Sequence, residues 1–208
     1  TGGDDGPSVT IAAAISFVNS EPEAELILVG LQDQLRAELA KHHAASHPRL
    51  SVIHASEVVT MDDPLEVALR RKKDSSMRVA IELVKEGRAH ACVSAGNTGA
   101  LMALAKIVIK TMPEIDRPAL AAIAPSARGD VVMLDLGANV QCDSRNLVEF
   151  AVMGECFARA VLGLPAPTFG LLNVGSEELK GDERIRLAAE ILRESHVGAQ
   201  FHGFIEGH

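Results

Sequence analysis

Two patterns of apolar residues alternate along this chain. Short continuous apolar runs, such as 25–30, are typical of buried parallel strands. Longer segments with apolar residues three and four positions apart, such as 32–43, predict helices. Strands are expected over 25–30, 50–53, 89–94, 118–125, 131–136, 169–174 and 200–205, and helices over 9–19, 32–43, 64–73, 76–86, 98–110, 147–162 and 182–194.

This alternation predicts an α/β fold with three α/β/α layers, in which helices cover both faces of a mostly parallel sheet. No repeat, low-complexity tract or linker interrupts the pattern. One contiguous domain over 1–208 is therefore the simplest interpretation, and a sheet split between two lobes is the alternative. The chain is expected to lack a first strand and a C-terminal portion, because it starts in a loop-like segment and stops at a strand end.

The composition is that of an ordinary globular protein, with 47% hydrophobic and 23% charged residues. Aromatic residues make up only 3%, with no Trp or Tyr, and the net charge is −8. Both features argue against nucleic-acid binding, which favours basic surfaces and aromatic stacking platforms. A negative net charge also repels anions, so any phosphate site must be built locally.

Motifs that are missing exclude several other functions. The three Cys residues are widely spaced with no CxxC pair, and no HExxH occurs, so no metal site is expected. The absence of GxSxG and GxGxxG argues against a serine hydrolase and a dinucleotide-binding protein. No apolar run approaches the roughly 18 residues of a membrane span, and no signal peptide precedes Thr1. A cytoplasmic protein with reduced thiols is expected.

Loops at expected strand exits are candidates for ligand binding, because α/β sheets bind ligands at the carboxyl ends of their strands. The first loop is Ser-Ala-Gly-Asn-Thr-Gly-Ala over 94–100. Its small residues let an anion approach the free N–H groups of a helix start. Thr98 is expected to cap the helix, and the Asn97 amide is expected to donate to the ligand. The alternative is a tight turn that needs glycine for its backbone conformation.

The second loop is Leu-Asp-Leu-Gly-Ala-Asn over 134–139. Asp135 lies among apolar residues, where a carboxylate needs a partner. It either tethers the loop or orients a neighbouring site group, with Asn139 as a neutral donor facing the pocket. The third loop, 173–181, offers Lys180 as a point charge for phosphate. For this loop the alternative is a solvated surface turn.

The run Arg-Arg-Lys-Lys over 70–73, followed by Ser75 and Ser76, is the densest positive patch in this acidic sequence. Arg70 and Lys73 are three residues apart and share one helix face. The hydroxyls and free N–H groups of the next helix start can donate to an anion. The alternative is an ordinary solvated face.

Taken together, several stretches resemble the PlsX family of acyl-ACP:phosphate acyltransferases. They are Gly-Gly-Asp-Asp-Gly-Pro over 2–7, Asp-Ser-Ser-Met over 74–77, the loop 94–100, Arg-Pro-Ala-Leu over 117–120, the loop 134–139, and Leu-Leu-Asn-Val-Gly-Ser-Glu-Glu-Leu-Lys-Gly over 171–181. The sequence departs from the family pattern at Asp5, Gln141 and Ser176. No acid role is therefore assigned at 141, and Glu177 and Glu178 are weak candidates for catalytic carboxylates.

The resemblance implies a fold like that of isopropylmalate dehydrogenases and phosphotransacetylases, a homodimer, and a further segment with peripheral membrane contact. It also implies that phosphate attacks the thioester of acyl-ACP, giving acyl phosphate and free acyl carrier protein for phospholipid (phosphatidic acid) synthesis. Phosphate is itself the nucleophile and a thiol leaves readily, so no cofactor is expected. The site must hold two anionic partners and stabilise an oxyanion.

On this basis Lys180, Asn97 and Asn139 are the candidate catalytic residues. The candidate substrate-binding residues are Arg70, Lys73, Ser75, Ser76, Ala95, Gly96, Thr98, Gly99, Asp135 and Gly137. Two alternatives stay open: a phosphotransacetylase-type enzyme that uses acyl-CoA, and a non-catalytic scaffold that binds acyl-ACP.

Overall fold

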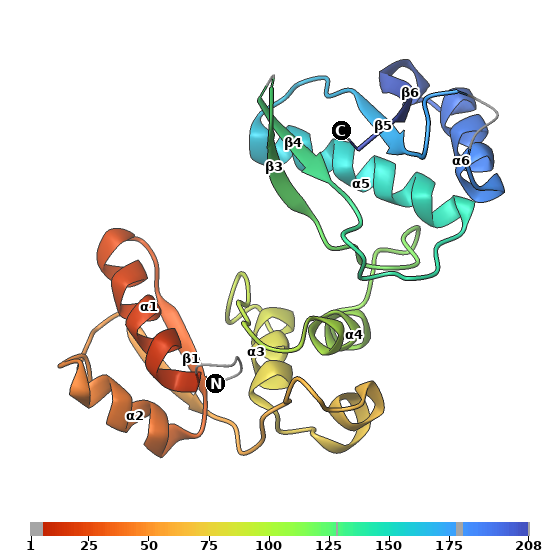
Figure 1. Cartoon of the computed structure of the whole chain (residues 1–208). Coiled ribbons are helices and arrows are strands. Elements are labelled where there is room, and N and C mark those ends of the chain that lie inside the picture. Colours follow the sequence, from red (N-terminus) through yellow and green to blue (C-terminus); the bar gives the residue numbers. More distant parts are fainter. Residues whose placement is uncertain (1–5, 128, 178–180, 208) are drawn as a thin grey trace. The chain divides into compact units, whose positions relative to one another are not determined.

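Figure 1 shows the chain as a computed structural model, which describes residues 6–127, 129–177 and 181–207. Its contacts gather into two compact units, Thr1–Lys110 (unit 1) and Thr111–His208 (unit 2). The assignment of 1–208 to a single phosphate acyltransferase domain stays a prediction.

The first part of unit 1 is a helix followed by a β-α-β arrangement. Its elements are α1 (Gly6–Ser20), β1 (Leu26–Gly30), α2 (Gln32–Lys41) and β2 (Leu50–His54). The two strands pair in parallel, with Leu26 opposite Leu50. The apolar sides of the two helices meet in a core that contains Ile11, Leu35 and Leu39. The four expected elements of this region are confirmed.

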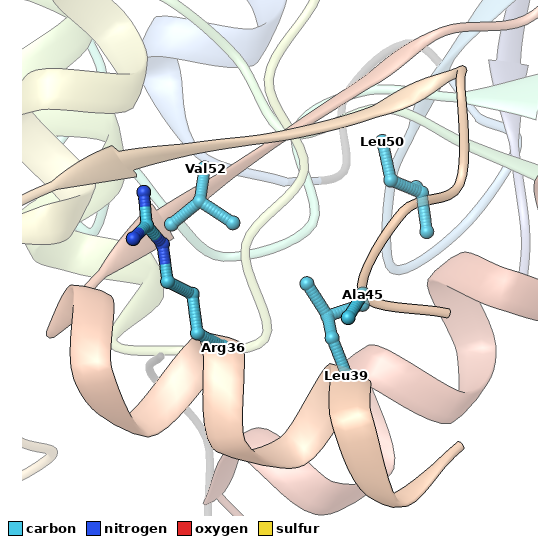
Figure 2. Close-up of a pocket in the computed structure, with 5 residues that line it drawn as sticks. All are labelled: Arg36, Leu39, Ala45, Leu50 and Val52. Atoms are coloured by element: carbon cyan, nitrogen blue, oxygen red, sulfur yellow. The ribbon is translucent and has the colours of Figure 1, made fainter. Parts of the chain in front are cut away.

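A pocket of about 370 Å³ lies between α2 and β2 (Figure 2). It is lined by Arg36 and Leu39 from α2, Ala45 from the following loop, and Leu50 and Val52 from β2. Most of these side chains are aliphatic, and none of them is a candidate site residue.

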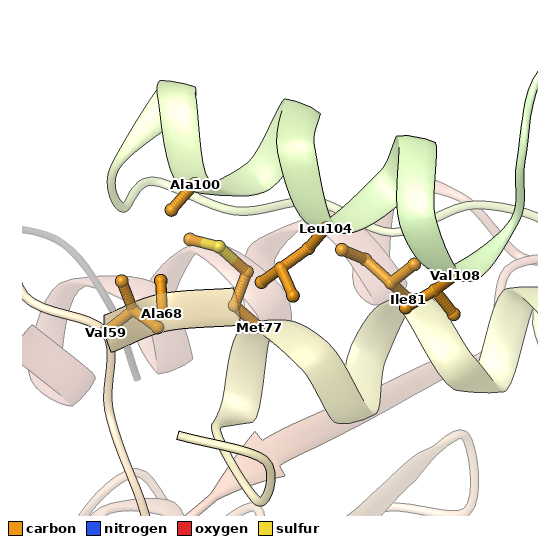
Figure 3. Close-up of a cluster of buried hydrophobic side chains, with 7 residues drawn as sticks. All are labelled: Val59, Ala68, Met77, Ile81, Ala100, Leu104 and Val108. Carbon is orange, nitrogen blue, oxygen red and sulfur yellow. The ribbon is translucent and has the colours of Figure 1, made fainter. Parts of the chain in front are cut away.

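Three helical elements surround the second core of unit 1. They are the π-helix η1 (Val67–Arg71), α3 (Ser76–Lys85) and α4 (Thr98–Val108). Figure 3 shows Met77 of α3 beside Ala100 of α4, and Ile81 beside Leu104, within one buried cluster. Helices α3 and α4 therefore run side by side in the same direction, and their N-termini lie at the same end.

The helix expected over 64–73 forms over 65–71 and is mostly a π-helix, in which the Lys72 N–H bonds to the Val67 carbonyl five residues back, at 3.0 Å. One prediction for unit 1 is wrong. The strand expected over 89–94 does not form, and Val93 is 97% exposed. In the described part of unit 1, β1 and β2 pair only with each other, so this segment has no strand beside it to satisfy its backbone groups.

Unit 2 begins with an antiparallel hairpin and continues with a second β-α-β arrangement. Its elements are β3 (Ala122–Ser126), β4 (Gly129–Met133), α5 (Ser144–Leu162), β5 (Phe169–Leu172), α6 (Glu183–Glu194), the 3-10 helix η2 (Gly198–Gln200) and β6 (Phe201–Ile205). Strands β3 and β4 are antiparallel because their connection is too short for a parallel crossover. Strands β5 and β6 pair in parallel, and their core includes Leu171, Leu192 and Phe204.

The strands expected over 118–125 and 131–136 are shorter than predicted. The outer ends of the two segments are loops, in which the Leu136 N–H bonds to the Leu120 carbonyl at 3.1 Å. The described strands form three two-stranded sheets, β1–β2, β3–β4 and β5–β6. Two of these pairs are parallel, as expected, but the described strands do not form the one continuous sheet that the sequence predicted. No helix in the described ranges is long and apolar enough to cross a membrane.

Candidate functional site

The loop before α4 places open backbone donors at a helix start. The Asn97 side chain caps this helix, with Oδ1 accepting from the Ala100 N–H at 3.0 Å. The Gly96 N–H donates to Ser94 Oγ at 3.2 Å. The N–H groups of Thr98 and Gly99 make no hydrogen bond to any described residue, and both residues are exposed. Asn97 rather than Thr98 is therefore the cap, and the next two N–H groups can receive an anion.

The nitrogen of the Asn97 side-chain amide is also hydrogen-bonded. Its Nδ2 donates to the Met61 carbonyl at 3.0 Å and to the Thr60 carbonyl at 3.5 Å. In this arrangement the amide fixes the loop instead of pointing a free donor at a ligand. A catalytic role for Asn97 stays a prediction.

Ser75 and Ser76 lie at the start of α3 and are buried. Ser75 caps the helix by accepting from the Arg78 N–H at 3.4 Å, and the Ser76 N–H donates to the Glu57 carbonyl at 2.9 Å. The neighbouring Asp74 carboxylate accepts from Ser56 Oγ at 2.5 Å and from the Ser56 N–H at 2.8 Å. These bonds to Ser56 hold the pKa of Asp74 below its usual value. The two serines thus hold α3 in place, and their role toward substrate stays a prediction.

The basic run 70–73 divides into outward and inward side chains. Arg70 is exposed and pairs with Glu66 at 3.3 Å, and Lys73 is exposed with no side-chain partner in the described ranges. Lys72 turns inward, where Nζ meets Asp63 at 2.5 Å and the Val58 carbonyl at 2.7 Å. Sequence reasoning missed Lys72, because nothing local distinguishes it from its basic neighbours.

The parallel packing of α3 and α4 brings several candidates of unit 1 to one end of the helix pair. Met77 in the first turn of α3 lies beside Ala100 in the first turn of α4 (Figure 3). Each helix N-terminus carries about half a positive charge from its aligned peptide dipoles. Lys73 adds a full positive charge just before α3. Two parallel dipoles repel each other, so an anion at this end would relieve that repulsion.

In unit 2, Asp135 joins the two loops that the resemblance singled out. Its Oδ1 accepts from the Leu120 N–H at 2.7 Å, and its Oδ2 accepts from the Asn139 N–H at 2.7 Å. The Asn139 amide donates to the Pro118 carbonyl at 2.9 Å and to Asp135 at 3.3 Å. Gly137 adopts a φ of 81°, a conformation that favours glycine. Of the two interpretations of Asp135, loop tethering is the one this geometry supports.

Replacing Asp135 with alanine is expected to lower the free energy of unfolding by about 3 kcal/mol, because two backbone N–H groups lose a charged acceptor. Asp135→Asn keeps one acceptor oxygen and is expected to cost less. Urea unfolding of the chain measures both effects. Asp130→Ala, at an exposed position of β4, is the matched control. Equal stabilities of the Asp135→Ala and Asp130→Ala variants would rule out the tether.

The third loop is held at both ends, while Glu178 and Lys180 lie outside the described residues. Before them, the Ser176 N–H donates to Glu206 Oε1 at 3.1 Å. After them, Arg184 pairs with Asp182, lowering the pKa of that carboxyl to about 2, and donates to the Cys142 carbonyl at 3.0 Å. The Cys142 thiol in turn donates to the Asn139 carbonyl at 3.3 Å. Within unit 2 the second and third loops therefore come together at their 139–142 and 181–184 ends.

The described residues offer few other reactive groups. Burial raises the pKa of the Cys92 thiol, and burial followed by the nearby Asp135 charge raises the pKa of Cys142. Neither thiol is thus activated as a nucleophile. His43 and His47 have the spacing HxxxH, but they follow α2 and lie outside any helix. No three metal-ligating side chains gather in the part of the chain that the structure describes.

Comparison with known proteins gives the same family as the motifs. Residues 1–208 match the family model described as fatty acid synthesis protein. Phosphate acyltransferases of Janthinobacterium sp. (strain Marseille) and Herminiimonas arsenicoxydans are each 61% identical over 209 residues, covering 99% of this chain and 58% of those proteins. The phosphate acyltransferase of Gluconacetobacter diazotrophicus is 58% identical over 100% of this chain and 55% of its own length. The chain thus spans somewhat over half the length of these relatives.

A solved structure gives the fold. The EutD phosphotransacetylase from Staphylococcus aureus superposes with a TM-score of 0.62 over 98% of this chain and 66% of that chain. At 15% identity this likeness concerns the fold alone, and it confirms the expected phosphotransacetylase-like α/β class. Motifs, family match and fold agree, and the chain belongs to the fatty acid synthesis protein family, PlsX.

Proposed function

We propose that this chain is the part of an acyl-ACP:phosphate acyltransferase that binds phosphate and shapes the acyl-transfer site. The observation that carries the proposal is family membership together with relatives 61% identical over nearly the whole chain that are phosphate acyltransferases. The open start of α4 and the exposed Lys73 just before α3 support it, because both suit an anionic substrate.

Phosphate is proposed to bind in unit 1, at the start of α4. The Thr98 and Gly99 N–H groups are unbonded among the described residues and exposed, and Gly99 leaves room beside them. Lys73 supplies an exposed positive charge near the start of the parallel helix α3. Ala95 and Gly96 are small, which allows a tetrahedral anion to approach the backbone.

Unit 2 by itself carries a second group of candidates, proposed to act on the thioester. Its loops 117–120 and 134–139 are tied by Asp135, and Arg184, after the third loop, donates to the Cys142 carbonyl. Lys180 of the third loop is the proposed cation. An ammonium group here would stabilise the thioester oxygen as it becomes negative. Asn139 uses its amide on Pro118 and Asp135 in the described arrangement, so a direct catalytic role would require an exchange of partners.

The proposed reaction needs no group beyond the two substrates. A phosphate oxygen attacks the thioester carbon and forms a C–O bond, and the carbonyl oxygen takes the negative charge. Collapse of this intermediate breaks the C–S bond, and the carrier thiolate leaves with the electron pair and then takes a proton. The protein contributes by holding two anionic partners together and by stabilising the oxyanion.

The partners that the resemblance implies belong to the same proposal. They are acyl carrier protein, inorganic phosphate, a second copy of the protein, and a membrane surface contacted from the cytoplasm. None of them requires a nucleotide or a metal.

Trapping of acyl phosphate tests the function. Full-length protein is incubated with long-chain acyl-ACP, phosphate and hydroxylamine, and acyl hydroxamate is measured against a reaction without phosphate. Phosphate-dependent hydroxamate is expected. A parallel reaction with acetyl-CoA separates the phosphotransacetylase alternative, which predicts product there and little from acyl-ACP. Protein that binds acyl-ACP without forming hydroxamate would instead be a scaffold.

Arg70 and Lys73 are expected to meet the acidic carrier protein or its phosphopantetheine arm. Replacing both with glutamine should weaken the use of acyl-ACP more at low than at high salt, because the Debye length falls to about 8 Å at physiological ionic strength. The KM for acyl-ACP, measured across a salt series, checks this. Lys85→Gln, an exposed lysine at the other end of α3, is the control. An equal loss at every salt concentration would place the pair inside the active site instead.

A further inference from the structure

Residues 60–63 form a turn that is closed by hydrogen bonds between its first and last residues. The Thr60 N–H donates to Asp63 Oδ2 at 2.7 Å. The Asp63 N–H returns to the Thr60 carbonyl at a longer 3.4 Å. The turn therefore depends on the Asp63 carboxylate for its shape.

Lys72 completes this turn with the one inward-facing ammonium of the basic run. Its Nζ contacts Asp63 Oδ2 at 2.5 Å and the Val58 carbonyl at 2.7 Å. The side chains of Lys72 and Asp63 are only 23% and 16% exposed, so the pair is largely shielded from water and salt. The hydrogen bond from Lys72 also lowers the pKa of Asp63.

The same turn also binds the loop before α4 through its backbone carbonyls. The carbonyls of Thr60 and Met61 accept from Asn97 Nδ2, and Asn97 Oδ1 caps α4 at Ala100. A continuous path of bonds thus runs from Lys72 through Asp63 and the turn to Asn97. It ends directly beside the open N–H groups of Thr98 and Gly99.

We propose that Lys72 is a positioning residue, which fixes the anion-binding start of α4 through Asp63, the 60–63 turn and Asn97. Its neighbours Arg70 and Lys73 face solvent, where substrates can reach them, whereas Lys72 acts on the protein itself. Without Lys72, the turn keeps the bond from Thr60 to Asp63 but loses its link to Val58. Asn97 would then have a less rigid partner, and the two N–H donors would be less well oriented for phosphate.

The expected change in the phosphate KM rests on the proposed function, whereas the expected loosening of the α4 start does not. Two readouts therefore test the positioning role in the full-length protein: hydrogen exchange at the Ala100 amide, and the KM for phosphate. In Lys72→Met, Ala100 exchange is expected to rise about tenfold, and the phosphate KM is expected to rise about tenfold with kcat within about threefold. Lys72→Arg should recover part of both effects, because it restores the charge beside Asp63.

Matched variants separate this path from a general loss of stability. Lys85→Met removes an exposed lysine from the opposite end of α3 and should change neither readout. Adding Lys72→Met to Asn97→Ala should raise the phosphate KM no further than Asn97→Ala alone, since both act through one path. If Lys72→Met does not fold, Asp63→Asn replaces it with the same expectations.

Two results would overturn the proposal. One is Ala100 exchange in Lys72→Met equal to that of the unchanged protein. The other is a phosphate KM in the Lys72→Met, Asn97→Ala double variant that rises by the product of the two single-variant increases. If the unchanged protein forms no acyl phosphate, the proposed function fails, and the exchange measurement alone decides on the positioning role.

Discussion

Replacing Lys180 with alanine is expected to lower kcat by about two to three orders of magnitude, which is typical of removing one electrostatic donor to a developing oxyanion. Lys180 lies outside the described residues, but its loop is anchored on both sides. Ser176 bonds to Glu206, and Gly181 has a φ of 93° and packs against Asn173, where a Cβ would overlap the amide oxygen. A charge on a loop with fixed ends can be carried to a defined position. Steady-state kinetics of acyl phosphate formation measure the effect.

Two further variants sharpen this test. Lys180→Arg should not restore full activity, because a planar guanidinium places its charge differently from a compact ammonium. Lys85→Ala removes an exposed lysine far along α3 and should leave kcat unchanged. Near-normal turnover in Lys180→Ala would make this loop a solvated surface turn. The catalytic contribution would then shift to Asn97 and Asn139.

Replacing Gly96 with valine is expected to raise the phosphate KM by at least tenfold while the fold stays intact. Gly96 has no positive φ, so its backbone does not require glycine for that reason. A branched side chain is expected to hinder the approach of an anion to the Thr98 and Gly99 N–H groups, the proposed phosphate site. Initial rates over a range of phosphate concentrations, together with the thermal midpoint, measure the two effects.

The matched control is Gly207→Val, the same change at an exposed position with open space around it. It should alter neither the phosphate KM nor the thermal midpoint. Unchanged phosphate saturation in Gly96→Val would show that the start of α4 is not the phosphate site. A large fall in its thermal midpoint would show instead that the loop is structural.

The sequence predicted elements well where local signals define them. Helix α3 begins at the Ser75 cap and is followed by Gly87, which has a φ of 71°. Helix α5 was expected from 147 but begins at Ser144, after a capping box at Asp143 that the prediction missed. Segment 89–94 has the same apolar character as a buried strand, yet it forms none. A strand exists only through its neighbour, and the neighbour cannot be read from the segment itself.

By itself, the sequence determined the family, the α/β class, and the loops that carry the candidate chemistry, because motifs and helix caps depend on residues close together in the chain. Only the tertiary structure decided what those residues touch. The Asn97 amide donates to the carbonyls of Thr60 and Met61, and Asp135 joins two loops. Both sets of contacts link segments that are distant in the sequence. It also turned Lys72 inward and left Lys73 in solvent. Two adjacent lysines have the same local sequence signal. They take different roles only because packing gives one of them a buried partner and leaves the other in water.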